Sequence, residues 1–360
     1  MNRLVATAVV SIPDPDPVIA SVCEHLAEHD ARIDRNGAAH LVTFSFGQGS
    51  LRAQPGVIEL LAESTDLSGL YYIRMALAGH LKHFAKPATP DVTWTGDGSD
   101  IVTPPNFRPV QVRSVRDITP HMRRVTFVGP DLDRFASNDD LHLGLVIPPK
   151  GGELVWPVVG RDGLLSWDED KPRPAIRRYT TRRCDPANGE IEIDFVVHED
   201  PGPGAAFAGR AKEGDWIGLA GPFGGSIRAD REWYLLGGDE TALPAIARNL
   251  ETFAGAKRGV ALIEVAGPDE EQAIDNRTGI EIRWLHRGSA APGALLAEAV
   301  RQVALPDGDQ SYFVWTACEF DGFKSIRAYL RKERGLTRDH HLSVAYWRKG
   351  QVEGDEDDDH

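Results

Sequence analysis

The order of its apolar patterns constrains the fold of this 360-residue chain more than any other feature. Over residues 109–229, short apolar segments recur between turn residues, which is typical of a small antiparallel β-barrel. Over residues 230–350, strand-like and helix-like segments alternate, which is typical of a parallel sheet with crossover helices. We therefore predict a barrel followed by an α/β domain.

The segments on either side of these two blocks have different compositions. Residues 1–88 combine extended patterns with helical periodicity and predict a small α+β domain. Residues 89–108 are rich in Pro, Gly, Ser, Thr and Asp and predict a linker. Residues 351–360 hold six acidic side chains and predict a disordered tail.

Charge and hydropathy exclude several classes of partner. The net charge of −14 argues against nucleic acid, because phosphate binding needs a basic face. The sequence contains no run of 18 apolar residues, so no membrane span is predicted. Pro13 interrupts the N-terminus before a signal-peptide core could form. We therefore expect a cytoplasmic protein, and the sequence leaves its oligomeric state open.

Metal ligands and disulfides are not predicted either. The three cysteines are far apart and form no CxxC pair, which predicts free thiols. Although His80 and His83 lie one helical turn apart, no cysteine or carboxylate is spaced with the histidines as in a metal site. We therefore predict no metal among the histidines of the first domain: His25, His29, His40, His80 and His83.

A predicted strand at Arg177–Arg182 combines side chains that a flavin dinucleotide needs. Strand alternation places Arg177 and Tyr179 on one side and Thr180 on the other. Tyrosine offers a flat ring face, arginine a planar fork for phosphate, and threonine a small donor. The alternative is an ordinary barrel strand with solvated arginines.

A glycine-rich stretch from His198 leads into a predicted helix at Ala205–Gly209. Small residues allow a close backbone approach, and a helix N-terminus offers free N–H groups to a pyrophosphate. Gly204 and Ala206 complete this candidate loop. An ordinary loop is the alternative.

A third segment, Leu235–Ala245, predicts a strand, a glycine turn and a helix start. Pro244 suits the first helical turn, and Thr241 is predicted to cap the helix. This order is typical of dinucleotide-phosphate binding, although the GxGxxG fingerprint is absent. A plain strand-to-helix turn is the alternative.

Taken in order, these motifs resemble the siderophore-interacting protein family, also called ferric-siderophore reductases. The resemblance spans about residues 109–350 and includes Gly238–Ile246, Trp284–Gly288 and Ala345–Gly350. The first 88 residues resemble a small domain family of unknown function found beside such reductases.

The resemblance implies a ferredoxin-reductase-like architecture that binds FAD in the barrel and NADPH or NADH in the α/β domain. It implies electron transfer from the nicotinamide through FAD to the iron of a ferric siderophore, with no acid–base residue. The cofactor contacts it implies are Arg177, Tyr179 and Thr180 at the flavin, His198, Gly204, Ala205 and Ala206 at the pyrophosphate, and Asp239, Glu240, Thr241 and Leu243 at the nicotinamide.

Cations are expected where an anionic ferric siderophore binds, and the candidates are Arg348 and Lys349, with Arg287 a weaker third. Solvated surface charge is the alternative for each. The chain departs from the family at Cys318, where a glycine is usual, so a thiol is expected near the nicotinamide. A flavin-dependent reductase with another acceptor and a siderophore-binding protein without turnover remain as alternative functions.

Overall fold

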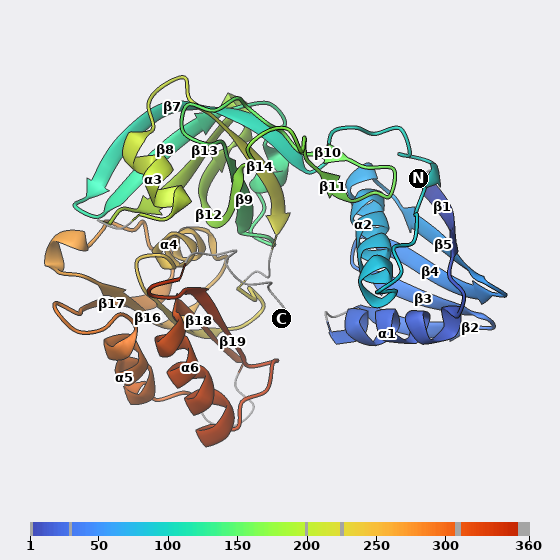
Figure 1. Ribbon diagram of the computed structural model, residues 1–360. Helices are drawn as coiled ribbons and strands as arrows, with labels where there is room; N and C mark the ends of the chain where they lie inside the picture. Colours follow the sequence, from blue (N-terminus) through green and yellow to red (C-terminus); the bar gives the residue numbers. More distant parts are fainter. Residues whose placement is uncertain (1–2, 29–30, 199–200, 224–226, 307–310, 352–360) are drawn as a thin grey trace. The chain divides into compact units, whose positions relative to one another are not determined.

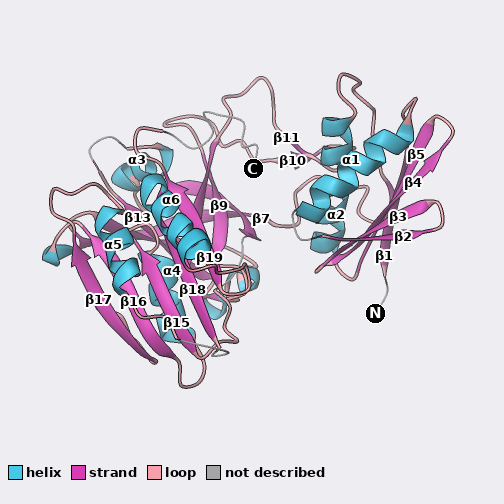
Figure 2. Ribbon diagram, turned by 90° about the horizontal axis from the view of Figure 1, so that it is seen from below, coloured by secondary structure: helices cyan, strands magenta, loops and turns pink. Residues whose placement is uncertain are grey.

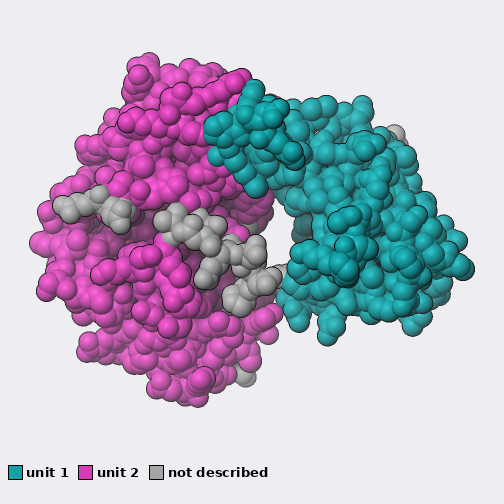
Figure 3. Space-filling model, viewed as in Figure 1, with its two compact units in different colours: residues 1–107, 155–173 teal, residues 108–154, 174–360 magenta. Residues whose placement is uncertain are grey.

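A computed structural model of the chain describes residues 3–28, 31–198, 201–223, 227–306 and 311–351 (Figure 1). Figure 2 shows the distribution of its helices and strands. The described residues form two compact units, which Figure 3 colours separately: residues 1–107 with 155–173, and residues 108–154 with 174–360. His29 and the predicted acidic tail beyond Gln351 lie outside the described residues.

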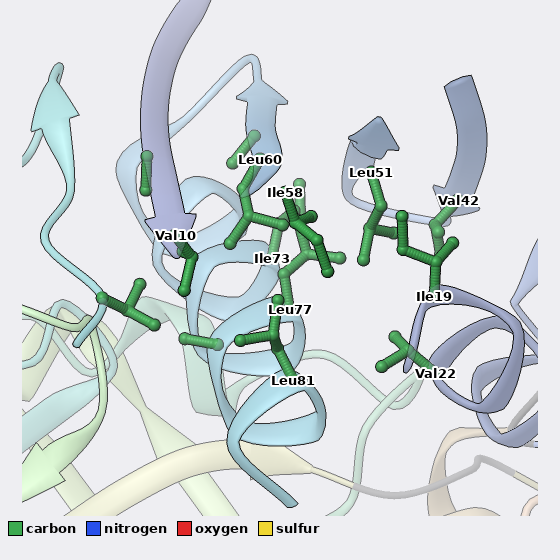
Figure 4. Close-up of a cluster of buried hydrophobic side chains, with 14 of the residues drawn as sticks. Val10, Ile19, Val22, Val42, Leu51, Ile58, Leu60, Ile73, Leu77 and Leu81 are labelled. Carbon is green, nitrogen blue, oxygen red and sulfur yellow. The ribbon is translucent and has the colours of Figure 1, made fainter. Parts of the chain in front are cut away.

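Unit 1 is an antiparallel sheet of strand order β2-β3-β4-β5-β1-β6 with helices α1 and α2 packed on it. Its elements are β1 (Leu4–Ser11), α1 (Pro15–Glu28), β2 (Arg32–Asn36), β3 (Ala39–Phe44), β4 (Gly47–Gln54), β5 (Val57–Ser64), α2 (Leu67–Phe84) and β6 (Thr95–Gly96). Apolar side chains from the strands and both helices meet in one core (Figure 4). Asp66 caps α2 by accepting a hydrogen bond from the Gly69 N–H at 2.9 Å.

Two segments beyond residue 88 complete unit 1. Val92 and Trp94 are buried in its core, and β6 pairs with β1. The short hairpin of β10 (Val158–Val159) and β11 (Leu165–Ser166) also belongs to this unit. Residues 89–107 and 155–173 therefore take part in the fold of unit 1.

Unit 2 begins with a closed barrel of strand order β12-β13-β8-β7-β14-β9. Its elements are β7 (Phe107–Thr119), β8 (Met122–Val128), a 3-10 helix (Asp133–Phe135), β9 (His142–Ile147), β12 (Ala175–Asp185), a 3-10 helix (Pro186–Asn188), β13 (Glu190–Val196), α3 (Pro203–Arg210) and β14 (Trp216–Phe223). Alternation along β13 buries Ile191, Ile193 and Phe195 completely in the barrel core.

The second part of unit 2 is a parallel sheet of order β17-β16-β15-β18-β19. Its elements are β15 (Trp233–Gly238), α4 (Leu243–Thr252), β16 (Arg258–Val265), a 3-10 helix (Pro268–Glu270), β17 (Gly279–His286), α5 (Ala294–Gln302), β18 (Tyr312–Glu319), α6 (Phe320–Ala328), a π-helix (Tyr329–Glu333) and β19 (His341–Trp347). Helix α4 covers one face of the sheet, whereas α5 and α6 cover the other (Figure 2). The predicted fold class is confirmed.

Helix α4 joins the parallel sheet to the barrel through the buried side chain of Arg248, which is 4% exposed. Its guanidinium donates hydrogen bonds of 2.6–3.2 Å to barrel-side oxygens: the backbone carbonyls of Phe135, Ala136, Ser137 and Thr181, and the side chain of Asn138. Arg182 of β12 adds a bidentate ion pair with Glu251 of α4, at 2.6 and 2.7 Å. Polar contacts therefore fix how α4 lies on the barrel.

We predict that Arg248→Ala lowers the free energy of unfolding of unit 2 by about 3 kcal/mol or more, because it leaves buried carbonyls without donors. Chemical denaturation followed by intrinsic fluorescence would measure the change. Arg277→Ala is the control, because its exposed pair with Asp275 contributes at most about 1 kcal/mol. Equal stabilities of the two variants would contradict the prediction.

Candidate functional site

Strand β12 and helix α3 bring together residues from two of the predicted motifs. The Tyr179 ring packs on Phe195, with ring centroids 4.5 Å apart. Gly204 lies against the same ring, since a Cβ placed on Gly204 would lie 2.2 Å from the Tyr179 Oη. The backbone of the candidate pyrophosphate loop therefore reaches the candidate flavin strand only because residue 204 is glycine.

The N-terminus of α3 carries no side-chain cap. Gly202 occupies the N-cap position with an extended backbone, and no side chain of the described residues bonds to the first N–H groups there. Ala205 is buried and Ala206 is half-buried, so the start of the helix presents backbone more than side chain. His198 is exposed after β13. These free N–H groups suit an anion.

Thr180 of the barrel is linked to β19, the last strand of the parallel sheet, through His142. Thr180 is 5% exposed and pairs with His142 across strands β12 and β9. The His142 Nε2 lies 2.5 Å from the Tyr346 Oη, with the two rings nearly perpendicular. Burial and the positive charge of Arg178 lower the pKa of His142 to about 4, so its imidazole is neutral at neutral pH.

Asp239 lies where three parallel strands end. Its Oδ1 accepts hydrogen bonds from the N–H and hydroxyl of Thr241, at 3.0 and 2.5 Å. Its Oδ2 accepts from the Glu319 N–H at 2.9 Å and from the Trp347 indole at 2.8 Å. Because Trp347 follows Tyr346, a continuous path of contacts leads from Thr180 to Asp239.

This arrangement shows one local prediction to be wrong. Thr241 does not cap α4, whose N-cap is Ala242 and lacks a side-chain cap bond. The Asp239 carboxylate, two residues earlier, takes both Thr241 donors instead. Leu243 is buried in the core between the sheet and the barrel.

Glu240 and Arg287, predicted for different roles, form an ion pair with an N···O distance of 2.6 Å. Arg287 also lies 3.8 Å from Glu264, which is completely buried and accepts the N–H groups of Gly293 and Leu296. The Arg287 side chain is only 16% exposed. It is therefore a buried partner of carboxylates and not a solvated cation.

Arg348 and Lys349 are both exposed immediately after β19. The Arg348 guanidinium lies over the Phe320 ring, 4.5 Å from its centroid, and the Lys349 N–H donates to Glu319 at 3.3 Å. No ion pair engages either side chain within the part of the chain that the structure describes. Both cations thus remain at the edge of the sheet near Asp239 and Trp347.

Cys318 faces away from α4 and the barrel. Its side chain is completely buried in the core that β18 forms with α5 and α6. A Cβ on Gly322 would lie 3.2 Å from the Cys318 sulfur, so the first turn of α6 packs on the thiol. Burial raises the pKa of the Cys318 thiol, and its function here is to fill the core.

Comparisons with known proteins identify these regions. The family of siderophore-interacting proteins matches residues 231–350, and the siderophore-interacting FAD-binding domain matches residues 111–226. A bacterial family described as uncharacterised, DUF2218, matches residues 7–95. The chain is 30% identical over 238 residues to ferric vibriobactin reductase ViuB of Vibrio cholerae, covering 66% of this chain and 87% of that protein.

The chain belongs to the siderophore-interacting protein family. Among solved structures, it is similar to a siderophore utilization protein from T. fusca, with a TM-score of 0.60, 42% identity and coverage of 68% of this chain and 94% of that one. It is also similar to the siderophore-interacting protein SipS from Aeromonas hydrophila, with a TM-score of 0.58, 28% identity and coverage of 69% and 94%.

Membership confirms the predicted family, the FAD cofactor and the class of flavin oxidoreductase. The local geometry fits FAD, because an uncapped helix N-terminus lies beside the Tyr179 ring and the glycine contact there leaves no room for a side chain. No described helix is long and apolar enough to cross a membrane, and no group of three metal-binding side chains gathers among the described residues.

We predict that Gly204→Ala weakens FAD binding about tenfold, because its methyl group would force the Tyr179 ring from its place, an overpacking cost of about 1–3 kcal/mol. Titration of flavin fluorescence would measure the dissociation constant. Gly209→Ala, farther along the same helix, is the matched control, since a Cβ at that position meets nothing within 4 Å. The same affinity for both variants would refute the role given to Gly204.

A second prediction concerns pH. Burial raises the pKa of the Asp239 carboxyl to about 6, against hydrogen bonds from Thr241 and Trp347 that lower it. The folded protein therefore holds this proton to a higher pH than the unfolded chain does. Folding binds protons between about pH 4 and 6, so the contribution of Asp239 to stability falls as pH rises through that window.

Relative to Asp239→Asn, the free energy of unfolding of the unsubstituted protein should fall by about 2 kcal/mol between pH 4 and pH 7. Denaturant titrations of both proteins across this range would test it, because other titrating groups cancel in the difference. A difference that stays constant with pH would contradict the raised pKa.

Proposed function

We propose that this protein is an NAD(P)H-dependent, FAD-containing reductase that releases iron from ferric siderophores as Fe(II) in the cytoplasm. The path of contacts from Thr180 through His142 and Tyr346 to the Asp239 turn carries the proposal. It places the strand with the flavin motif beside the strand ends where a dinucleotide binds in α/β sheets. Electron transfer from a nicotinamide to a flavin requires that proximity.

FAD, when bound, supplies the redox chemistry, accepting two electrons from a nicotinamide and passing them on singly. The residues of this chain bind and orient. Tyr179 would offer its ring to the flavin side, and the α3 N-terminus would offer its N–H groups to the pyrophosphate. The neutral His142 holds Tyr346 at the junction without adding a charge there.

Asp239 acts by positioning, because its two oxygens already accept hydrogen bonds from protein donors. It fixes the ends of β15, β18 and β19 relative to one another. Glu240 and Arg287 neutralise each other beside them, so we assign Arg287 to the structure of the nicotinamide side and not to siderophore binding.

The ferric siderophore is the substrate, and each Fe(III) takes one electron, so one NAD(P)H reduces two ferric ions. Hard oxygen ligands bind the smaller, more highly charged Fe(III) better than Fe(II), so reduction weakens the complex. Arg348 and Lys349 are exposed cations at the sheet edge and attract an anionic complex. No general acid or base is needed.

An anaerobic assay tests this function. Purified FAD-loaded protein receives NADPH or NADH, a ferric siderophore and a ferrous chelator, while flavin and ferrous absorbance are followed together. Bleaching of the flavin followed by appearance of ferrous complex is the expected result. Flavin bleaching without ferrous product would indicate another acceptor, and siderophore binding without bleaching would indicate a binding protein.

We predict that Arg348→Ala combined with Lys349→Ala raises the KM for an anionic ferric siderophore about tenfold and reduces its dependence on salt, since exposed cations act through long-range attraction. The rate of flavin reduction by the nicotinamide should stay unchanged. Arg277→Ala serves as the control, because Arg277 precedes β17 at the opposite, amino-terminal edge of the sheet. A KM unaffected by the double substitution would remove both residues from the substrate site.

A further inference from the structure

The chain leaves the barrel between two strands that pair with each other. Strand β9 ends at Ile147 and β12 begins at Ala175, and these two residues are partners in the barrel sheet. Most of the intervening chain does not fold with the barrel, because residues 155–173 belong to unit 1. Unit 1 thus holds a segment that is joined to β9 by residues 148–154 and to β12 by residue 174.

Asp162 is the centre of this attachment. Its carboxylate accepts a hydrogen bond from the Lys82 Nζ of α2 at 2.5 Å, and its backbone carbonyl accepts the Trp94 indole N–H at 2.8 Å. A second carboxylate contact, from the Leu164 N–H at 3.0 Å, fixes the turn itself. The segment is therefore tied to a helix of unit 1 and to the residues that follow it.

The turn also fits closely against buried groups of unit 1. Gly163 has a φ of +81°, and a Cβ there would lie 3.2 Å from both the Arg74 Cβ and the Trp94 Nε1. Arg74 is 1% exposed and lies over the Trp94 ring. Leu164 packs on the core of unit 1. The turn is thus part of that core.

Backbone hydrogen bonds extend the attachment along the segment. The Trp94 N–H donates to the Arg161 carbonyl at 3.1 Å, and the Val159 N–H donates to the Val102 carbonyl at 2.8 Å. Trp156 contacts Phe107, with ring centroids 5.5 Å apart. The segment therefore contacts unit 1 on both sides of the turn.

We infer that unit 1 is an anchoring module, which holds residues 155–173 and thereby orders the chain that leads into the barrel strand with the flavin motif. Only residue 174 separates the anchored segment from β12, which holds Arg177, Tyr179 and Thr180. Ordering the segment reduces the conformational freedom of the chain that enters β12 and so lowers the entropy that FAD binding must overcome. This last step rests on the FAD contacts proposed for β12.

A pair of glycine variants of the full chain tests the inference. Gly163→Ala and Gly151→Ala both place a side chain in the left-handed region, at φ values of +81° and +67°. They therefore share the backbone strain. A Cβ at Gly151 meets nothing within 4 Å, whereas a Cβ at Gly163 presses on Arg74 and Trp94. A difference between the two variants in cleavage or in FAD affinity therefore comes from the contact of the turn with Arg74 and Trp94.

We expect Gly163→Ala to speed tryptic cleavage after Arg161 and to weaken FAD binding about fivefold, the lower end of typical coupling between sites. Gly151→Ala should leave both unchanged. Asp162→Asn, which removes the charge that Lys82 contacts, should act in the same direction as Gly163→Ala. Circular dichroism before the assays verifies that each variant is folded.

Cleavage that does not increase in either attachment variant would overturn the inference, and so would increased cleavage with unchanged FAD affinity. These outcomes are independent of the proposed electron acceptor. If FAD affinity falls as expected but the protein reduces no ferric siderophore, the proposed function fails while the anchoring role stands. If the protein reduces ferric siderophores but the attachment variants behave like Gly151→Ala, the proposed function stands and the anchoring role fails.

Discussion

The junction between barrel and parallel sheet depends on one buried guanidinium. Removing Arg248 from water is costly, and burial lowers its pKa accordingly. The cost is offset because the carbonyls of residues 135–137, where the 3-10 helix ends, and a carbonyl of β12 converge on it, with Asn138 completing the set. Apolar packing alone would let α4 slide on the barrel, whereas these directed bonds select one register. The flavin motif therefore has a defined position relative to the dinucleotide turn.

Asp239 completes that geometry from the other side of the junction. It links the turn after β15 to Glu319 at the end of β18 and to Trp347 at the end of β19. The carboxyl ends of parallel strands form the usual binding edge of such sheets. A carboxylate that satisfies the N–H groups of this edge makes it rigid but leaves its own oxygens occupied. Around it, Glu240 is paired with Arg287, whereas the cations after β19 are exposed and form no ion pair within the described part of the chain.

Local patterns in the sequence were sufficient for much of this fold. The alternation at Glu190–Val196 and the glycine turn before α4 depend on neighbours within a few residues, so both were predictable. The role of Arg287 was not, because it depends on Glu240, which only the tertiary fold brings near it. The role of Thr241 was missed for a local reason, because Asp239 two residues earlier takes its hydroxyl. Helix-cap statistics favoured Thr241 as a cap, but the nearby Asp239 competes for the same hydroxyl. Cys318 likewise could be placed on the α5–α6 side of the sheet only once the register of β18 was known.

The attachment of residues 155–173 to unit 1 is harder to read from sequence for a related reason. The segment contains little regular secondary structure. The residues that it contacts, Lys82 and Trp94, lie more than 60 residues earlier in the chain. Composition presents the stretch around Trp94 as a linker, although Val92 and Trp94 are buried. Because unit 1 combines residues 1–107 with residues 155–173, no single position in the chain separates it from unit 2. The function of unit 1 is then better sought in what it does to the flavin strand than in a chemistry of its own.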